Sequence, residues 1–210
     1  MSKVVLASAN AGKLRELQAL LADCGLEVLP QSSLGIVAPE EDGATFVENA
    51  LLKARHAARE SGLPAIADDS GLEVDALDGR PGIHSARYAG DNRSDDDNKA
   101  KLLGELAAVP AEARTARFRC AMVFVRDAGD PQPLVSEAAW EGSIGFEPRG
   151  AGGFGYDPLF VVAGDTRSAA EMPADEKNQV SHRAQALRAL VRAIIEEVPG
   201  TGMPVPGTTD

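Results

Sequence analysis

The sequence predicts an α/β fold in which helices flank a mixed central β-sheet. Short apolar runs typical of strands alternate with segments of helical periodicity, which is the pattern of a sheet covered by helices. Several neighbouring strands are separated only by turns, and a strictly parallel sheet does not permit such short connections. The chain has 210 residues, of which 44% are hydrophobic and 25% charged, so it is long enough to bury a substantial core.

The expected elements follow one another in a clear order. Apolar or alternating runs predict strands at residues 4–7, 28–29, 65–67, 72–76, 118–125, 134–140 and 158–162. Apolar residues at helical spacing predict helices at residues 14–21, 45–61, 95–107 and 181–198. The second helix has the clearest limits, because Thr45 and Glu48 form a capping-box pattern and Gly62 ends it. The Pro- and Gly-rich tail at 199–210 is expected to be disordered.

Composition and charge limit the classes of partner. The formal net charge of -11 argues against a nucleic-acid-binding surface, because phosphate neutralisation needs clustered Lys and Arg. No apolar run approaches the roughly 18 residues that would span a membrane. The N-terminus begins at once as a strand, without the apolar core of a signal peptide, so we expect a cytoplasmic protein. Cys24 and Cys120 are then expected to be free thiols.

Asp68 and Asp69 are adjacent carboxylates that follow the apolar run 65–67 and precede Ser70 and Gly71. We expect the pair at the tip of a buried strand. Two like charges so close raise one another's pKa unless a cation lies between them. Hard oxygen ligands of this kind favour Mg²⁺ or Mn²⁺ over zinc. The alternative is an ordinary acidic turn, since Asp-Asp-Ser-Gly is also good turn chemistry.

Two further segments carry charges suited to phosphate and metal. Residues 8–13, Ser-Ala-Asn-Ala-Gly-Lys, join a strand to a helix, where backbone amides and a lysine attract anions. Alternatively, Asn10 is only a helix cap and Lys13 is solvated. Residues 40–43, Glu-Glu-Asp-Gly, can supply a second arm of a metal site, although acidic residues also favour a helix start. Lys53 lies on the polar face of the following helix and either faces the same phosphates or is solvated.

The glycine-rich segment 150–158 and the start of the last helix are candidates for recognising a planar ring. Three of the glycines match G-x-G-x-x-G, but a strand follows where the dinucleotide-binding fingerprint requires a helix. Glycines around an aromatic and an acid permit close approach of the backbone to a ring, whereas the alternative is a flexible hairpin. Lys177 and the run Ser-His-Arg at 181–183 concentrate donors suited to carbonyl oxygens or phosphate. The alternative there is a capped helix start with solvated charges.

Taken together, these segments resemble the inosine triphosphate pyrophosphatase family, enzymes that remove ITP, dITP and XTP from nucleotide pools. The matching motifs are S-A-N-A-G-K, E-E-D-G-A-T-F-V-E-N-A-L-L-K-A, A-D-D-S-G-L-E-V-D-A-L, P-G-I-H-S-A-R-Y-A-G, G-G-F-G-Y-D-P-L-F and E-K-N-Q-V-S-H-R. They occur in the family's order between residue 3 and about residue 198, and no functional position departs from the pattern. Six motifs in register make the resemblance highly specific.

The resemblance implies a mixed α/β fold of two lobes with a substrate cleft between them, one catalytic domain over residues 1–198, and a homodimer. It also implies Mg²⁺-dependent hydrolysis between the α and β phosphates, which gives a nucleoside monophosphate and pyrophosphate. The partner would be a purine nucleoside triphosphate, namely ITP, dITP or XTP, with neither nucleic acid nor a membrane involved.

The resemblance further implies a role for each site residue. Asp69 would accept a proton, and Glu41 and Asp69 would hold Mg²⁺. The triphosphate would be bound by Ser8, Ala9, Asn10, Ala11, Gly12 and Lys13, with Lys53 nearby, and Ser70 would contact substrate. The base pocket would consist of Phe154, Gly155, Tyr156, Asp157, Lys177, His182 and Arg183. Asp68 would be either a partner of the metal ligands or a further ligand.

Other functions stay open at this point. A pyrophosphatase of the same architecture could act on other modified nucleotides, such as a pyrimidine triphosphate, although the base-pocket residues argue against it. A nucleotide sensor without turnover would lack the metal carboxylates, yet Glu41, Asp68 and Asp69 are all present. An RNA-binding module fails on charge and on its few aromatics, one Trp, two Tyr and six Phe.

Overall fold

The computed structural model describes residues 3–8, 10–21, 27–91 and 94–197. The expectations for Ala9, for Cys24 and for the tail at 199–210 therefore lie outside the described residues. Cys120 is a buried free thiol, as expected, and burial raises its pKa to about 12.

Within the described residues, six strands form one mixed sheet in the order β2-β1-β3-β4-β5-β6. Their bounds are β1 (Lys3–Ala7), β2 (Glu27–Pro30), β3 (Ala65–Val74), β4 (Thr115–Val125), β5 (Leu134–Ile144) and β6 (Phe160–Val162). Strand β1 pairs in parallel with β2 and β3, whereas β5 pairs antiparallel with β6. The mixed sheet that short connections predicted is thus confirmed.

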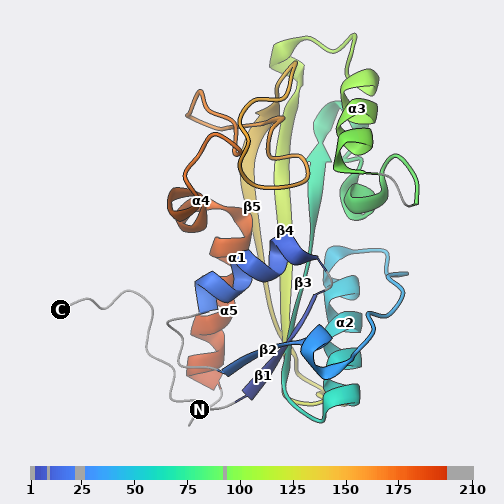
Figure 1. Cartoon of the computed structure of the whole chain (residues 1–210), viewed down its shortest axis with the longest axis vertical. Helices are drawn as coiled ribbons and strands as arrows, with labels where there is room; N and C mark the ends of the chain where they lie inside the picture. Colours follow the sequence, from blue (N-terminus) through green and yellow to red (C-terminus); the bar gives the residue numbers. More distant parts are fainter. Residues whose placement is uncertain (1–2, 9, 22–26, 92–93, 198–210) are drawn as a thin grey trace, which may run out of the picture. The chain divides into compact units, whose positions relative to one another are not determined.

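Five α-helices accompany the sheet in the described part of the chain (Figure 1). They are α1 (Ala11–Leu21), α2 (Phe46–Ser61), α3 (Asp95–Glu105), α4 (Ala174–Val180) and α5 (His182–Glu197). Short 3₁₀ helices lie at Gln31–Leu34, Asp75–Leu77, Gly82–Arg87 and Ala111–Ala113. Helix α4 escaped prediction because seven residues make too few turns for apolar periodicity to be visible. No helix in the described ranges is long and apolar enough to cross a membrane.

Helix α2 begins and ends where its sequence predicts. The Thr45 hydroxyl accepts a hydrogen bond from the Glu48 amide, and Gly62 ends the helix in the left-handed conformation at φ 67°. The Glu48 carboxylate accepts from the Ala44 amide at 2.7 Å, one residue before the position that a capping box uses.

One strand prediction is wrong. The runs 65–67 and 72–76 were expected as two strands with Asp68 and Asp69 at a tip between them. Instead, β3 continues without a break from Ala65 to Val74. Strand β3 pairs with β1 over Ala65–Ala67 and is also hydrogen-bonded to β4, and this pairing within the sheet overrides the turn preference of Asp-Asp-Ser-Gly.

The chain forms two compact units, each made of discontinuous segments. The first unit comprises residues 1–69, 120–138 and 183–210, and the second comprises residues 70–119 and 139–182. Each of β3, β4 and β5 contributes residues to both units.

In the first unit, helices cover both faces of the sheet (Figure 1). Side chains alternate along a strand, so Val4 and Leu6 of β1 pack with apolar residues of α1 and α5. Val5 and Ala7 point to the other face and pack with a row of alanines on α2. These small side chains let α2 lie close to the sheet, and this closeness brings its polar residues within reach of β3.

The second unit has its own apolar core. Its centre is an aromatic group of Phe118, Trp140 and Phe160, with ring centroids 4.5 Å apart for Phe118 and Phe160. Leu102 and Leu106, at the end of α3, are part of the same core.

Gly142 of β5 offers a test of this packing. A Cβ at this position would lie 2.4 Å from the Val161 carbonyl oxygen and 2.6 Å from the Phe160 ring. We expect Gly142→Ala to lower the free energy of unfolding by about 1–3 kcal/mol, the cost of overpacking. The control is Gly104→Ala in α3, where a Cβ meets nothing within 4 Å and the variant should be neutral or more stable. Urea denaturation measures the free energy of unfolding of both variants, and an equal change in the two would contradict the prediction.

Candidate active site

Asp68 and Asp69 point to opposite faces of the sheet, because successive residues of a strand alternate. Ile66, two residues before Asp68, packs with α1 and α5, whereas Ala67, two residues before Asp69, packs with α2. The two carboxylates therefore face different helices, and both are almost completely buried. An exposed acidic turn is excluded.

Asp69 lies among polar side chains of α2. Its Oδ1 is 3.2 Å from the Lys53 ammonium, and its Oδ2 accepts a hydrogen bond from the Asn49 amide. Lys53 also pairs with Glu41 at 2.9 Å. The segment before α2 thus folds back so that one ammonium group joins the carboxylates of Glu41 and Asp69. Lys53 is buried, which excludes the solvated alternative.

Asp68 lies among cations from α1 and α5. Its Oδ2 is 3.1 Å from the Lys13 ammonium and 3.5 Å from Arg183 Nε. Arg183 also pairs with Glu16 of α1, and Lys13 Nζ is 4.0 Å from Asp69 Oδ1. Lys13 consequently reaches both aspartates of β3.

The surroundings move the two aspartate pKa values in opposite directions. Burial works against ionisation of Asp68, but Lys13, Arg183 and Lys53 together hold its pKa well below the usual range. For Asp69, burial dominates, and with the repulsion of Glu41 and Asp68 it raises the pKa despite the two lysines. Asp68 is therefore a stable anion, whereas Asp69 is a carboxylate that protonates more readily.

The loop before α1 provides backbone and side-chain donors beside this cluster. Asn10 Oδ1 accepts hydrogen bonds from the amides of Gly12 and Lys13 at 2.9 and 3.1 Å, so Asn10 caps α1. Ser8 is buried, and its hydroxyl accepts from the Asn10 amide. Ala11, the first residue of α1, is exposed. The alternative of a plain cap is thus half right, because Lys13 is ion-paired rather than solvated.

The donor set of this unit fits a hard divalent cation. Glu41 and Asp69 present carboxylate oxygens to one common positive charge, that of Lys53, and Mg²⁺ prefers such oxygens. No group of three His, Cys, Asp or Glu side chains gathers as a ready-made metal site among the described residues. Two carboxylates suffice for Mg²⁺, which usually completes its shell with water and substrate phosphates.

The second unit contains the glycine-rich segment and Lys177. The Lys177 ammonium is 2.7 Å from Asp157 Oδ2, and both side chains are buried. Asp157 also accepts a hydrogen bond from the Phe154 amide, and Lys177 Nζ lies 5.3 Å from the Phe154 ring centre. The segment does connect the antiparallel strands β5 and β6, as a hairpin would, but these contacts anchor it. Solvated charge at Lys177 is excluded.

His182 stacks on the aromatic core of the same unit. Its ring centre is 4.9 Å from that of Phe118, with 12° between the planes, and 6.4 Å from that of Trp140. Tyr156 is buried and donates its hydroxyl proton to the Ser85 carbonyl oxygen. The Gly155 amide donates to Asp95 Oδ2 at 2.9 Å.

The expected base-pocket residues thus divide between the units. Phe154, Gly155, Tyr156, Asp157, Lys177 and His182 belong to the second unit, whereas Arg183 belongs to the first, against Asp68 and Glu16. Ser70 follows Asp69 in β3 and is half-buried.

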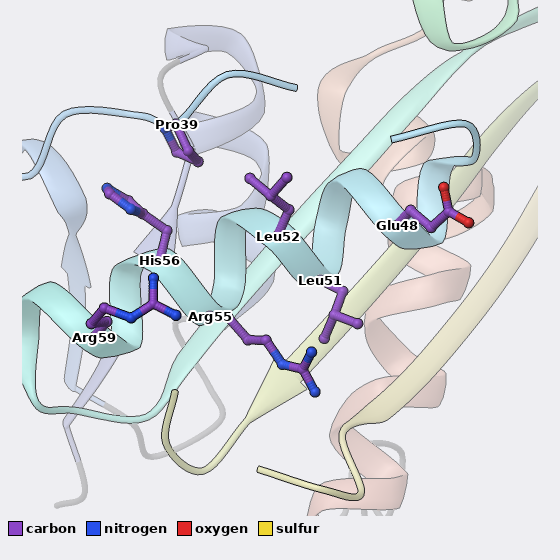
Figure 2. A pocket seen from close by; sticks show the side chains of 7 residues that line it. All are labelled: Pro39, Glu48, Leu51, Leu52, Arg55, His56 and Arg59. Carbon is purple, nitrogen blue, oxygen red and sulfur yellow. The ribbon is translucent and has the colours of Figure 1, made fainter. Parts of the chain in front are cut away.

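A surface hollow of 410 Å³ lies along α2 (Figure 2). Its lining is Pro39, Glu48, Leu51, Leu52, Arg55, His56 and Arg59. None of the predicted site residues is among them, and His56 Nε2 is already 2.9 Å from the Val37 carbonyl oxygen. This hollow is separate from the carboxylates and lysines described above.

Several contacts of the site escaped the sequence reasoning. Glu16 was not singled out, although it lies three residues after Lys13 and so on the same helix face. Asn49 was given no role either, although it lies four positions before Lys53 and so on the same polar face of α2, and that spacing was the available signal. Asp95 and Phe118 contact the second-unit residues through long-range pairing, for which the sequence carries no local sign.

Comparison with known proteins agrees with these observations. The model of the Ham1 family matches residues 4–193. A dITP/XTP pyrophosphatase of Methylococcus capsulatus is 64% identical over 188 residues, covering 90% of this chain and 94% of the relative. A protein of the same name from Escherichia coli O157:H7 is 56% identical over 194 residues, covering 92% and 98%.

Solved structures show the same fold. A HAM1 protein from Coxiella burnetii superposes with a TM-score of 0.86 at 48% identity, over 93% of this chain and 100% of that one. The Ham1 protein of Staphylococcus aureus gives a TM-score of 0.81 at 38% identity, with the same coverage. The resemblance seen in the motifs is confirmed, and the chain belongs to the Ham1 family.

Proposed function

We propose that this protein is a Mg²⁺-dependent pyrophosphatase that hydrolyses ITP, dITP and XTP to the monophosphate and pyrophosphate. Relatives at 56–64% identity carry the name dITP/XTP pyrophosphatase. The observation that carries the proposal is the buried cluster in which Lys53 pairs with both Glu41 and Asp69, while Lys13 reaches Asp68 and Asp69. A triphosphate needs both lysines and carboxylates, since its charge must be neutralised by cations and its hydrolysis requires a base.

In this proposal Glu41 and Asp69 hold Mg²⁺, which supplies charge neutralisation and Lewis acidity when bound. Asp69 accepts the proton of the attacking water, for which a raised pKa is suited because an acceptor works best near the operating pH. Lys13 and Lys53 neutralise phosphate oxygens. The Ser8–Lys13 loop donates hydrogen bonds to the triphosphate, and Ser70 contacts substrate.

Recognition of the base is assigned to Phe154–Asp157, Lys177, His182 and Arg183. Hypoxanthine and xanthine present a 6-oxo acceptor where adenine presents an amino donor, so a buried donor is left unpaired against adenine. The buried Lys177 ammonium supports this role for the second unit. We include Arg183 among the base-binding residues because it matches the family motif. Its contacts with Asp68 and Glu16 favour an additional role, which is to hold the Asp68 carboxylate in place. We also propose that the protein acts as a homodimer with one catalytic domain over residues 1–198.

Parallel measurement of pyrophosphate release tests the proposal. With Mg²⁺ present, release from ITP, XTP and dITP is expected to exceed release from ATP, GTP and dUTP by at least about a hundredfold, because a site built to pair one group rejects its replacement strongly. Fast release from a pyrimidine nucleotide instead would overturn the base assignment and leave the metal site standing. Tight binding of ITP without release would show a sensor rather than an enzyme.

A further inference from the structure

Asn49 is a fully buried amide in the first turn of α2 for which the proposed chemistry names no role. The side chain is 1% exposed, although asparagine is a residue that usually lies at the surface. Its Nδ2 donates to Asp69 Oδ2 at 3.2 Å, and its Oδ1 accepts from the Gly43 amide at 2.8 Å. One side chain therefore joins the carboxylate of β3 to the segment that precedes α2.

Gly43 shows independently that this segment is packed tightly against Asn49. A Cβ on Gly43 would lie 2.7 Å from Asn49 Oδ1 and 2.9 Å from Glu48 Cβ, closer than real side chains come. Glycine is thus required for the close approach. Glu41, two residues earlier, extends from this anchored segment to Lys53.

We propose that Asn49 is a positioning residue that holds the carboxylates of Asp69 and Glu41 in register with one another. The inference rests on the proposed function, in which these two carboxylates share Mg²⁺. The amide is suited to the task because it has both a donor for Asp69 and an acceptor for Gly43. Without it, Asp69 loses a fixed orientation and the segment carrying Glu41 loses its attachment to α2.

Asn98 provides a matched control for a purely structural role. It is 2% exposed and lies in α3. Its Oδ1 accepts from the Ala89 amide at 2.7 Å, and its Nδ2 donates to the Ala86 carbonyl oxygen at 3.2 Å. Both asparagines thus make two hydrogen bonds from a helix. Those of Asn98 both go to the backbone, whereas one of those of Asn49 goes to the Asp69 carboxylate.

The experiment compares Asn49→Ala, Asn98→Ala and Gly43→Ala with the wild-type protein. Binding of Mn²⁺ to each nucleotide-free protein is measured from the EPR signal of free Mn²⁺, and kcat for ITP is measured at saturating Mg²⁺. ITP binding without metal, followed by calorimetry in EDTA, reports on the lysines separately.

For Asn49→Ala we expect Mn²⁺ affinity and kcat each to fall at least about tenfold, the usual effect of removing a residue that orients metal ligands. Gly43→Ala should reproduce this loss because its Cβ displaces the same segment, and metal-free ITP binding should be unchanged in both. Asn98→Ala should lower the melting temperature to a similar degree while its Mn²⁺ affinity stays that of wild type.

The outcomes separate the inference from the function on which it rests. Wild-type Mn²⁺ affinity in Asn49→Ala, an equal loss in Asn98→Ala, or a wild-type protein that binds no Mn²⁺ would overturn the inference. If instead Mn²⁺ affinity falls as expected but the wild-type protein releases no pyrophosphate from ITP, the proposed function fails and the positioning role stands.

Discussion

Replacement of Asp69 by asparagine is expected to reduce kcat for ITP hydrolysis by about 10²–10⁴-fold, the contribution that general base catalysis typically makes. The substitution preserves shape but removes the proton acceptor and weakens a metal ligand. The neighbours that hold the side chain, Asn49 and Lys53, come from α2 and are untouched.

The same substitution should cost little stability. Asp69 has a pKa raised in the folded protein, mainly by burial, so folding favours its neutral form. The stability linked to that form is full below the unfolded pKa and is lost as pH rises through the folded pKa. At neutral pH the charged form of Asp69 therefore destabilises the metal-free folded protein, and a neutral asparagine removes this destabilisation.

Steady-state kinetics and urea denaturation of the metal-free protein at pH 7.5 together check this prediction. Glu40→Gln is the control, because Glu40 is an exposed acid next to Glu41 and should keep wild-type activity. An Asp69→Asn variant that retains more than about a tenth of the wild-type kcat would exclude Asp69 as the base.

The contrast between Asp68 and Asp69 also shows what the sequence can predict and what it cannot. The local sequence alone predicts that these two residues belong to a charged site, because two adjacent carboxylates after an apolar run need cations. It does not predict their geometry, because Asp-Asp-Ser-Gly favours a turn locally, whereas β3 continues through it as a strand of the sheet between β1 and β4. Alternation along that strand then gives each aspartate different nearest partners, and Lys13 reaches both.

Features that depend on residues close in sequence were predicted correctly. The start and end of α2 follow from Thr45 and Gly62, because capping depends on residues a few positions apart. The partners of Arg183 could not be found in this way. Glu16 and Asp68 are far from it in sequence, and only the packing of α1 and α5 on one face of the sheet brings the three together.

Asp68→Asn is expected to lower the free energy of unfolding by about 3 kcal/mol at neutral pH. Removing one partner of a buried ion pair typically costs about 3–5 kcal/mol, because the remaining charge stays buried without compensation. The lower end applies here, since Arg183 keeps Glu16 and Lys13 keeps a more distant contact with Asp69.

The pH dependence distinguishes this ion pairing from a simple packing effect. Because the pKa of Asp68 is lowered in the folded protein, its contribution is full above the unfolded value of about 3.9 and is lost as pH falls through the folded value. The difference between the wild-type protein and Asp68→Asn should therefore be constant from pH 7 to about pH 5 and should shrink below about pH 4. Urea denaturation across that range, with the exposed Asp127→Asn as control, measures it. If the difference in the free energy of unfolding stays the same below pH 4, the loss of stability comes from the shape of asparagine and not from the missing charge. Asp68 would then lose its role as the anion that holds Lys13 and Arg183 in place.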